Sequence, residues 1–282
     1  MISVNEKPVE LKTFPNGETR LDLLQFNWLD EGDRVTIDLD YRDDSDLIHL
    51  MMMKKSIDNS GARFESVNLS IGYMPYSRMD RQTTDAFTLK YVANFINDLH
   101  FDNVEVSEPH SDVAVALLDR VYPLYPSADW LLRRALLDIE FDREWDRILF
   151  PDAGAQKRYS ALEGFKTMTA TKHRDAEGNL SKCKIDGGKG DYSKVVIIDD
   201  LCSYGGTFLN VAKGLCDMRE GWGMICPDIY LVVTHLERSV YLGDMIDSGL
   251  IKGIYCTNSL HDAPEHAIVK MYDLRTAKEI TQ

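Results

Sequence analysis

Short runs of β-branched and apolar residues alternate with segments of helical periodicity along almost the whole chain, and no other feature limits the possible folds as strongly. Runs with the length of buried strands cover residues 34–40, 66–73, 103–107, 147–151, 166–171, 194–199, 228–234 and 253–257. Segments with helical spacing cover residues 46–59, 88–99, 111–121, 129–138, 208–219 and 239–248. Strands that alternate with helices usually pair in parallel and are covered on both faces. The sequence therefore predicts an α/β fold with mostly parallel sheets flanked by helices.

The series of strands and helices runs twice, which predicts two domains in the 282 residues. The two series meet at a seam near residues 137–145, where a charge-rich stretch at residues 138–146 separates them. We place one domain at residues 1–140 and the other at residues 141–282. In open α/β sheets, ligands bind beyond the carboxyl ends of the strands. The residues that directly follow each expected strand are therefore the candidates for chemistry.

The strongest local signal is a buried apolar run that ends in two adjacent acids and continues through two glycines into a helix near Phe208. The segment between strand and helix holds the polar and small residues expected to bind a ligand: Asp199, Asp200, Ser203, Tyr204, Gly205, Gly206 and Thr207. Carboxylates accept hydrogen bonds from the vicinal hydroxyls of a sugar. Glycines let backbone N–H groups approach a phosphate at a helix N-terminus. The motif predicts a ribose-phosphate site, and a strand end with a tight turn and no ligand is the alternative.

This motif resembles the PRPP-binding signature of phosphoribosyltransferases, in which PRPP is phosphoribosyl diphosphate. Further segments resemble the PRPP synthetases specifically and occur in the family's order at residues 14–18, 75–81, 108–110, 151–158 and 172–174. The resemblance covers about residues 10–260. It implies two tandem phosphoribosyltransferase-like domains, the second of which carries the ribose-phosphate loop.

The resemblance also implies an activity and a role for each matching residue. The expected enzyme is a ribose-phosphate diphosphokinase, which moves the β,γ-diphosphate of ATP to the C1 hydroxyl of a 5-phosphorylated ribose and gives AMP and PRPP. Lys172 and Arg174 match the catalytic pair, and His110 and Asp152 match the residues that hold the Mg²⁺ cofactor. The residues that match ATP-binding positions are Phe14, Asn16, Glu18, Arg78, Asp80 and His110.

These roles agree with the chemistry of phosphoryl transfer. A diphosphate in transfer concentrates negative charge, so catalysis depends mainly on positioning by cations and metal ions. Arg78 and the pair Lys172 and Arg174 each follow an expected strand and can supply positive charge. Mg²⁺ prefers oxygen ligands and keeps several waters, so one carboxylate and one histidine suffice as protein ligands. The sequence does not identify a general base.

The chain departs from the family pattern at positions that recognise substrates. Ser203 and Tyr204 replace the usual Asp-Thr, Asn16 replaces an aspartate, and Met79 replaces a glutamine. These changes leave the acceptor open between ribose 5-phosphate and ADP-ribose, which a short phage-type branch of the family uses when it rebuilds NAD⁺. Two other functions also remain: a phosphoribosyltransferase that consumes PRPP, and a non-catalytic regulatory subunit.

The composition limits the partners and the compartment. Lys and Arg number 32 and Asp and Glu 46, so the net charge of −14 argues against nucleic-acid and acidic-membrane binding. No apolar run is long enough to span a membrane. The five cysteines form no C-x-x-C pair, so we expect reduced thiols in a cytoplasmic protein. The resemblance of the Phe14 loop implies a homo-oligomer, either a dimer or a hexamer, because the family's loop reaches a neighbouring subunit.

Overall fold

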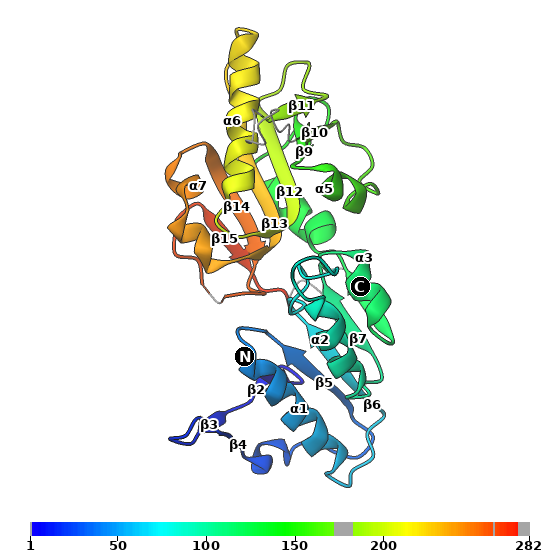
Figure 1. Cartoon of the computed structure of the whole chain (residues 1–282). Coiled ribbons are helices and arrows are strands. Elements are labelled where there is room, and N and C mark those ends of the chain that lie inside the picture. Colours follow the sequence, from blue (N-terminus) through cyan, green and yellow to red (C-terminus); the bar gives the residue numbers. More distant parts are fainter. Residues whose placement is uncertain (1, 172–182, 262, 276–282) are drawn as a thin grey trace. The chain divides into compact units, whose positions relative to one another are not determined.

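The chain divides into two compact units, Met1–Tyr125 and Pro126–Gln282, each built around its own sheet (Figure 1). The computed structural model describes residues 2–171, 183–261 and 263–275. The division lies closer to the N-terminus than the expected boundary at residue 140. The reason is packing, because η2 (Ser127–Leu131) and α4 (Leu132–Asp138) contribute their apolar side chains to a core of the second unit.

The first unit contains a mixed sheet with the strand order β2-β1-β5-β6-β7-β8. Its parallel part consists of β5 (Arg34–Leu39), β6 (Ser66–Ile71), β7 (Val104–Ser107) and β8 (Val121–Leu124). On the other edge, β1 (Ile2–Val4) runs antiparallel to β5, and β2 (Lys7–Pro8) runs antiparallel to β1. The helices of this unit are α1 (Ser45–Asp58), α2 (Thr88–Asn97) and α3 (Asp112–Leu117).

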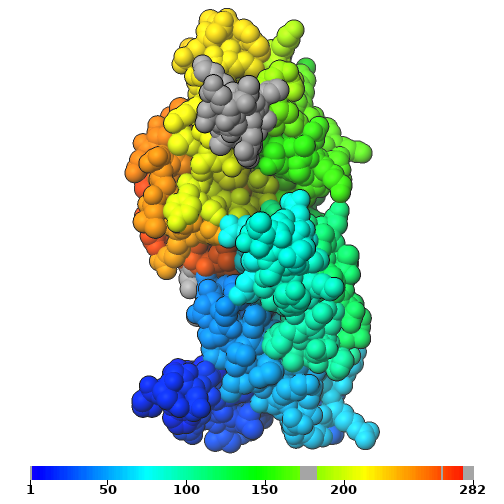
Figure 2. All heavy atoms as spheres, viewed as in Figure 1, coloured from blue at the N-terminus to red at the C-terminus, as the bar shows by residue number. Residues whose placement is uncertain are grey.

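A hairpin stands out from the body of the first unit (Figures 1 and 2). It is formed by β3 (Leu11–Thr13) and β4 (Thr19–Leu21), and η1 (Leu23–Phe26) follows it. The hydroxyl of Thr19, which pairs with Thr13 beside the turn, lies 2.9 Å from Nε2 of His49 on α1, so this contact ties the hairpin to the unit. Apolar side chains on this segment face solvent, since Phe14 is 49% exposed and Leu24 is 72% exposed.

The second unit contains a sheet with the strand order β11-β10-β9-β12-β13-β14-β15. Its parallel strands are β9 (Arg147–Phe150), β10 (Thr167–Thr171), β12 (Lys194–Cys202), β13 (Asp228–Leu236), β14 (Ile251–Thr257) and β15 (Val269–Tyr272). The edge strand β11 (Lys184–Asp186) runs antiparallel to β10. The remaining helical segments are α5 (Ala153–Arg158), α6 (Gly206–Gly221), η3 (Arg238–Leu242) and α7 (Asp244–Asp247).

The central strand β12 is covered on both faces, which explains why its sequence is apolar without alternation. Val195 and Ile197 pack in one core with side chains of α6 and α7. Val196 and Ile198 pack in a second core with side chains of η2, α4 and α5. Full burial of each such side chain contributes roughly 1.5–3 kcal/mol. The predicted α/β class follows directly from this arrangement.

Every expected strand has a counterpart among the described residues, whereas two expected helices are shorter than predicted. The segment 111–121 forms only α3, because the chain turns after Leu117 and enters β8 at Val121. The segment 239–248 breaks at Gly243 into η3 and α7. A Cβ atom on Gly243 would lie 2.1 Å from the carbonyl oxygen of Tyr204, so the chain needs a glycine at this close approach.

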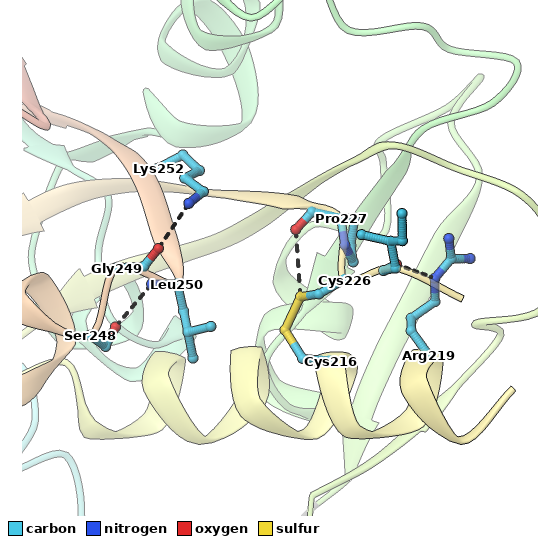
Figure 3. The surroundings of a disulfide bond; sticks show 9 residues. Cys216, Arg219, Cys226, Pro227, Ser248, Gly249, Leu250 and Lys252 are labelled. Atoms are coloured by element: carbon cyan, nitrogen blue, oxygen red, sulfur yellow. Dashed lines mark hydrogen bonds between the residues drawn. A yellow bond between two sulfur atoms is a disulfide. The ribbon is translucent and has the colours of Figure 1, made fainter. Parts of the chain in front are cut away.

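The prediction that all five cysteines are reduced thiols is wrong for Cys216 and Cys226, which form a disulfide (Figure 3). Cys216 lies on α6 and Cys226 lies shortly before β13, with Cα atoms 4.7 Å apart. The turn after α6 brings them together, and Arg219 holds that turn by donating from Nε to the carbonyl of Ile225. The sequence showed no pairing motif because the contact depends on this reversal of the chain. The other three cysteines, Cys183, Cys202 and Cys256, take no part in a disulfide.

Candidate functional site

Candidate residues of the second unit gather at the carboxyl edge of its parallel sheet. Asp199 and Asp200 lie near the end of β12, and Asp152 directly follows the neighbouring strand β9. Because parallel strands end at the same edge, residues from segments far apart in the sequence meet there. The sheet therefore brings the expected ribose-binding acids and the expected metal ligand to one side of the same unit.

The two acids share one arginine that the sequence analysis did not assign. Nη1 of Arg158 lies 2.5 Å from Oδ1 of Asp200 and 3.5 Å from Oδ1 of Asp199. All three side chains are largely buried, with 15% of Arg158, 16% of Asp199 and 5% of Asp200 exposed. The backbone N–H of Asp200 also donates to Oδ1 of Asp199, at 2.9 Å. The site thus contains two adjacent carboxylates and a cation that contacts both.

Burial of its carboxyl group, together with the charge of Asp200, raises the pKa of Asp199. The positive charge of Arg158 acts in the opposite direction on Asp199. Burial alone would lower the pKa of Arg158, but its attraction to Asp200 outweighs this effect, so the guanidinium stays charged. At Asp199, burial and the neighbouring Asp200 therefore outweigh the opposing charge of Arg158.

A hydrogen-bond network supports the backbone of β12 beside the acids. The hydroxyl of Ser127, on η2, donates to the carbonyl of Asp199 at 3.2 Å and lies 2.7 Å from the hydroxyl of Thr234 on β13. The hydroxyl of Thr257, on β14, donates to the carbonyl of Thr234 at 2.8 Å. Ser127, Thr234 and Thr257 are each fully buried. These bonds connect the ends of β12, β13 and β14 and hold the position of Asp199.

The glycine loop ends at the N-terminus of α6, as the motif predicts. Gly205 has a φ of +81°, and a Cβ atom there would lie 2.8 Å from Cβ of the buried Met245. Gly206 is the first residue of α6, and a Cβ atom there would meet no atom within 4 Å. The N-terminus of a helix carries partial positive charge and N–H donors that bind anions. Gly206 thus leaves open space at a place suited to a phosphate.

Tyr204 is 60% exposed, next to this glycine loop. Ser203 is half-buried, and its carbonyl accepts a weak hydrogen bond from Sγ of Cys202 at 3.5 Å. Thr207 is half-buried in the first turn of α6. The loop therefore presents a large aromatic ring to solvent beside the open position at Gly206.

Asp152 caps the N-terminus of α5. Its Oδ1 accepts the backbone N–H of Ala155 at 3.0 Å. Among the described residues, its Oδ2 makes no hydrogen bond or ion pair, and the side chain is half-buried. A half-buried carboxylate with one oxygen available is suited to bind Mg²⁺ directly or through one of the waters of the ion. The described residues contain no group of three or more metal-ligating side chains.

Lys172 and Arg174, the expected catalytic pair, lie outside the described residues. Their segment follows β10 directly, and β10 neighbours β9 in the sheet. Asp152 follows β9, so the expected catalytic pair and the expected metal ligand come, in the sequence, after two strands that are parallel neighbours in the sheet.

The first unit holds the expected ATP-binding residues, and the hairpin tip carries three of them. A turn connects β3 and β4, in which the N–H of Phe14 donates to the carbonyl of Glu18 at 2.8 Å. The side-chain carbonyl of Asn16 accepts the N–H of Glu18 at 3.2 Å. Asn16 therefore shapes the turn, a task that an aspartate could also perform. The exposed Phe14 ring stands at this tip.

Arg78, Asp80 and His110 follow two neighbouring strands of the first unit. Arg78 is exposed, whereas Asp80 is half-buried and pairs with Arg81 at 3.5 Å. Both follow β6, and the half-buried His110 follows β7, which pairs with β6. The sheet thus places these two expected ATP-binding segments at one edge of the first unit, apart from the three residues on the hairpin.

Sequence reasoning named the segment 151–158 but gave Arg158 no role. The signal available was its place in a motif that already contained Asp152. Thr234 carried no signal because it stands in an ordinary strand pattern, and Ser127 carried none because it stands just before an ordinary helix pattern. Only the folded sheet brings Ser127 and Arg158 to the acid pair.

No helix among the described residues has both the length and the apolar character needed to cross a bilayer.

No model of a known protein family matches the sequence. A ribose-phosphate pyrophosphokinase from Saccharolobus solfataricus is 27% identical over 230 residues, which are 76% of this chain and 73% of the relative. Another from Sulfurisphaera tokodaii is 24% identical over 284 residues, which are 95% of this chain and 90% of the relative.

Among solved structures, the phosphoribosylpyrophosphate synthetase from Mycobacterium smegmatis matches with a TM-score of 0.71 and 17% sequence identity. The match covers 97% of this chain and 89% of that chain. The predicted fold of two tandem phosphoribosyltransferase-like domains is confirmed by this match, and the predicted resemblance to the PRPP synthetases is confirmed by the relatives. The expected class of enzyme, a transferase of the ribose-phosphate diphosphokinase type, agrees with their names.

Proposed function

We propose, from the resemblance of this chain to ribose-phosphate pyrophosphokinases over most of its length, that it is an ATP-dependent diphosphotransferase. The reaction moves the β,γ-diphosphate of ATP to the C1 hydroxyl of a 5-phosphorylated ribose and gives AMP and PRPP. The observation that carries the proposal is the pairing of Asp199 and Asp200 with the open helix N-terminus at Gly206. Two carboxylates suit the vicinal hydroxyls of ribose, and the helix N-terminus suits its phosphate.

The cationic residues supply the charge that diphosphoryl transfer needs. Lys172 and Arg174 contact the diphosphate in this proposal, and Arg78 contacts ATP. Such groups act by stabilising negative charge that develops in the transition state. The acceptor hydroxyl attacks directly, so no protein nucleophile is required.

Mg²⁺ fits the carboxylate of Asp152, because this ion prefers oxygen ligands. Bound there, the ion neutralises phosphate charge and orients the phosphates. Asp152 fixes its own carboxylate through the cap of α5, which leaves Oδ2 for the ion or one of its waters. Phe14, Asn16 and Glu18 contact the adenine from an exposed hairpin tip. This placement supports a homo-oligomer in which the tip reaches a neighbouring subunit.

A second acceptor, ADP-ribose, is favoured by the exposed ring of Tyr204 beside the loop. An aromatic side chain can stack on adenine, and a diphosphate ester presents less charge to the loop than a terminal phosphate. The chemistry is otherwise the same and gives ADP-ribose pyrophosphate, a product suited to NAD⁺ salvage.

The test is incubation of the purified protein with ATP and Mg²⁺, and with either ribose 5-phosphate or ADP-ribose. Ion-pair chromatography with mass spectrometry identifies the nucleotide and sugar products. We expect AMP and a sugar heavier by one diphosphate, only when an acceptor is present. Acceptor-dependent ADP without AMP would contradict the proposal, and a phosphoribosyltransferase that consumes PRPP would need no ATP. Asp199→Asn serves as the control for the acceptor site.

A further inference from the structure

We infer that Arg158 is a positioning residue for the acceptor sugar, because it holds Asp199 and Asp200 together as a pair of hydrogen-bond acceptors for the vicinal hydroxyls. The inference deepens the proposed function and rests on it. Arg158 does not touch the reacting atoms in this view and acts only through the two acids.

The contacts show that one guanidinium nitrogen serves both carboxylates. Nη1 of Arg158 is 2.5 Å from Asp200 and 3.5 Å from Asp199, each measured to Oδ1. The guanidinium is planar and rigid, so it fixes the direction of the carboxylates more strictly than a flexible ammonium group. Because the Oδ1 atoms of both acids face the arginine, the acids are oriented to receive a ligand on the opposite side.

Arg158 also acts on the protonation of the two acids. Two adjacent carboxylates that are largely buried repel each other and lose hydration, so without a cation one of them takes up a proton. Even with Arg158 present, burial and the charge of Asp200 raise the pKa of Asp199, and the charge of Arg158 offsets only part of that rise. A protonated carboxyl group donates through one oxygen, and the pair then has fewer acceptor positions for two hydroxyls. The charge of Arg158 therefore favours the acceptor character that a cis-diol needs, and its contacts fix the direction of the two acids.

The short helix α5 couples this pair to the expected metal ligand. Asp152 caps the first turn of α5, and Arg158 is its last residue. A helix of this size spans roughly 9 Å at 1.5 Å per residue. The ring of Tyr159, which is buried, lies 6.0 Å from the guanidinium carbon of Arg158 and supports its position. One element therefore sets the location of both the carboxylate for Mg²⁺ and the cation for the acid pair.

The experiment compares the steady-state kinetics of three full-length proteins: the wild type, Arg158→Gln and Arg158→Lys. In one series either acceptor is varied at saturating ATP, and in a second series ATP is varied. For Arg158→Gln we expect the KM of the acceptor to rise on the order of tenfold to a hundredfold, as for loss of one partner of a buried charge pair. The KM of ATP should stay within about twofold. Arg158→Lys keeps the charge but not the geometry, and its acceptor KM should lie between the two.

The matched control is Arg133→Gln. Arg133 pairs with Asp129 at 3.1 Å on the same unit, but its side chain is 75% exposed. Exposed pairs contribute little, so this variant should keep the kinetics of the wild type. Circular dichroism and thermal unfolding of each variant identify any loss of fold. If Arg158→Gln does not fold, the test uses Arg158→Lys. Its acceptor KM and its affinity for the acceptor, measured by calorimetric titration, are then compared with those of the wild type.

A double-mutant cycle separates positioning from a general structural role. The cycle compares the rise in acceptor KM that Arg158→Gln causes in the wild type with the rise that it causes in an Asp200→Asn background. We expect the rise in the Asp200→Asn background to be smaller by a factor of about three or more, because the effects of coupled residues are not additive. Additive effects would overturn the inference, and so would an unchanged acceptor KM in a folded Arg158→Gln or Arg158→Lys variant. In both cases an active wild type leaves the proposed function standing. A wild type that neither turns over nor binds an acceptor by calorimetry would overturn the function and this inference together.

Discussion

Alanine substitutions at Gly205 and Gly206 should have opposite effects, because the two glycines serve different purposes. Gly205 has a φ of +81°, and an alanine in the left-handed region costs about 1–2 kcal/mol. Its Cβ would also lie 2.8 Å from both Cβ and Sδ of Met245, and overpacking of a buried side chain costs about 1–3 kcal/mol. We therefore expect Gly205→Ala to lower the free energy of unfolding by about 2–5 kcal/mol.

Gly206→Ala should stabilise the protein slightly while weakening the acceptor. Gly206 is the first residue of α6, and its Cβ would meet no atom within 4 Å. Replacement of a helical glycine by alanine in a compatible conformation stabilises by about 0.4–1 kcal/mol. The same methyl group would occupy the space through which a phosphate reaches the helix N-terminus. We expect the acceptor KM to rise about tenfold, which corresponds to about 1.4 kcal/mol of binding energy.

Urea unfolding, followed by fluorescence, measures the shift in stability, and initial rates with varied acceptor measure KM. The pair of variants controls for itself, since both add one methyl group to the same loop. An unchanged acceptor KM in Gly206→Ala would refute the placement of the phosphate at this helix. A Gly205→Ala variant as stable as the wild type would refute the packing argument at Met245.

Three further outcomes follow from the site and the disulfide. Cys216→Ser should lower the free energy of unfolding by about 2–3 kcal/mol, as expected for opening a loop between residues separated by 10 in sequence, and reduction of the wild type should remove the difference in urea unfolding. Lys172→Ala and Arg174→Ala should each reduce kcat by about 10² with ATP binding kept, and near-normal turnover in both would exclude them from catalysis. Tyr204→Thr should shift the ratio of kcat/KM about tenfold toward ribose 5-phosphate, and an unchanged ratio would show that the ring does not select the acceptor.

Several features could be predicted from the sequence because they depend on a few neighbouring residues. The alternation of strands with helices follows from periodicity, and the run at residues 195–198 predicted a strand buried on both faces. The acids and glycines after that run stand at the strand end and helix start where the motif placed them. The strand β15 was not predicted, because it is a short edge strand whose apolar pattern is weak.

The sequence by itself determined the fold class and the candidate residues at each strand end, because local periodicity and chain direction suffice for both. Only the tertiary structure decided the contacts of Arg158 with the acid pair and of Ser127 with the carbonyl of Asp199. It also decided the disulfide between Cys216 and Cys226. These contacts depend on the order of strands in the sheet and on where the chain reverses, which arise from the packing of distant segments. Such packing leaves no local pattern in the residues that take part in it.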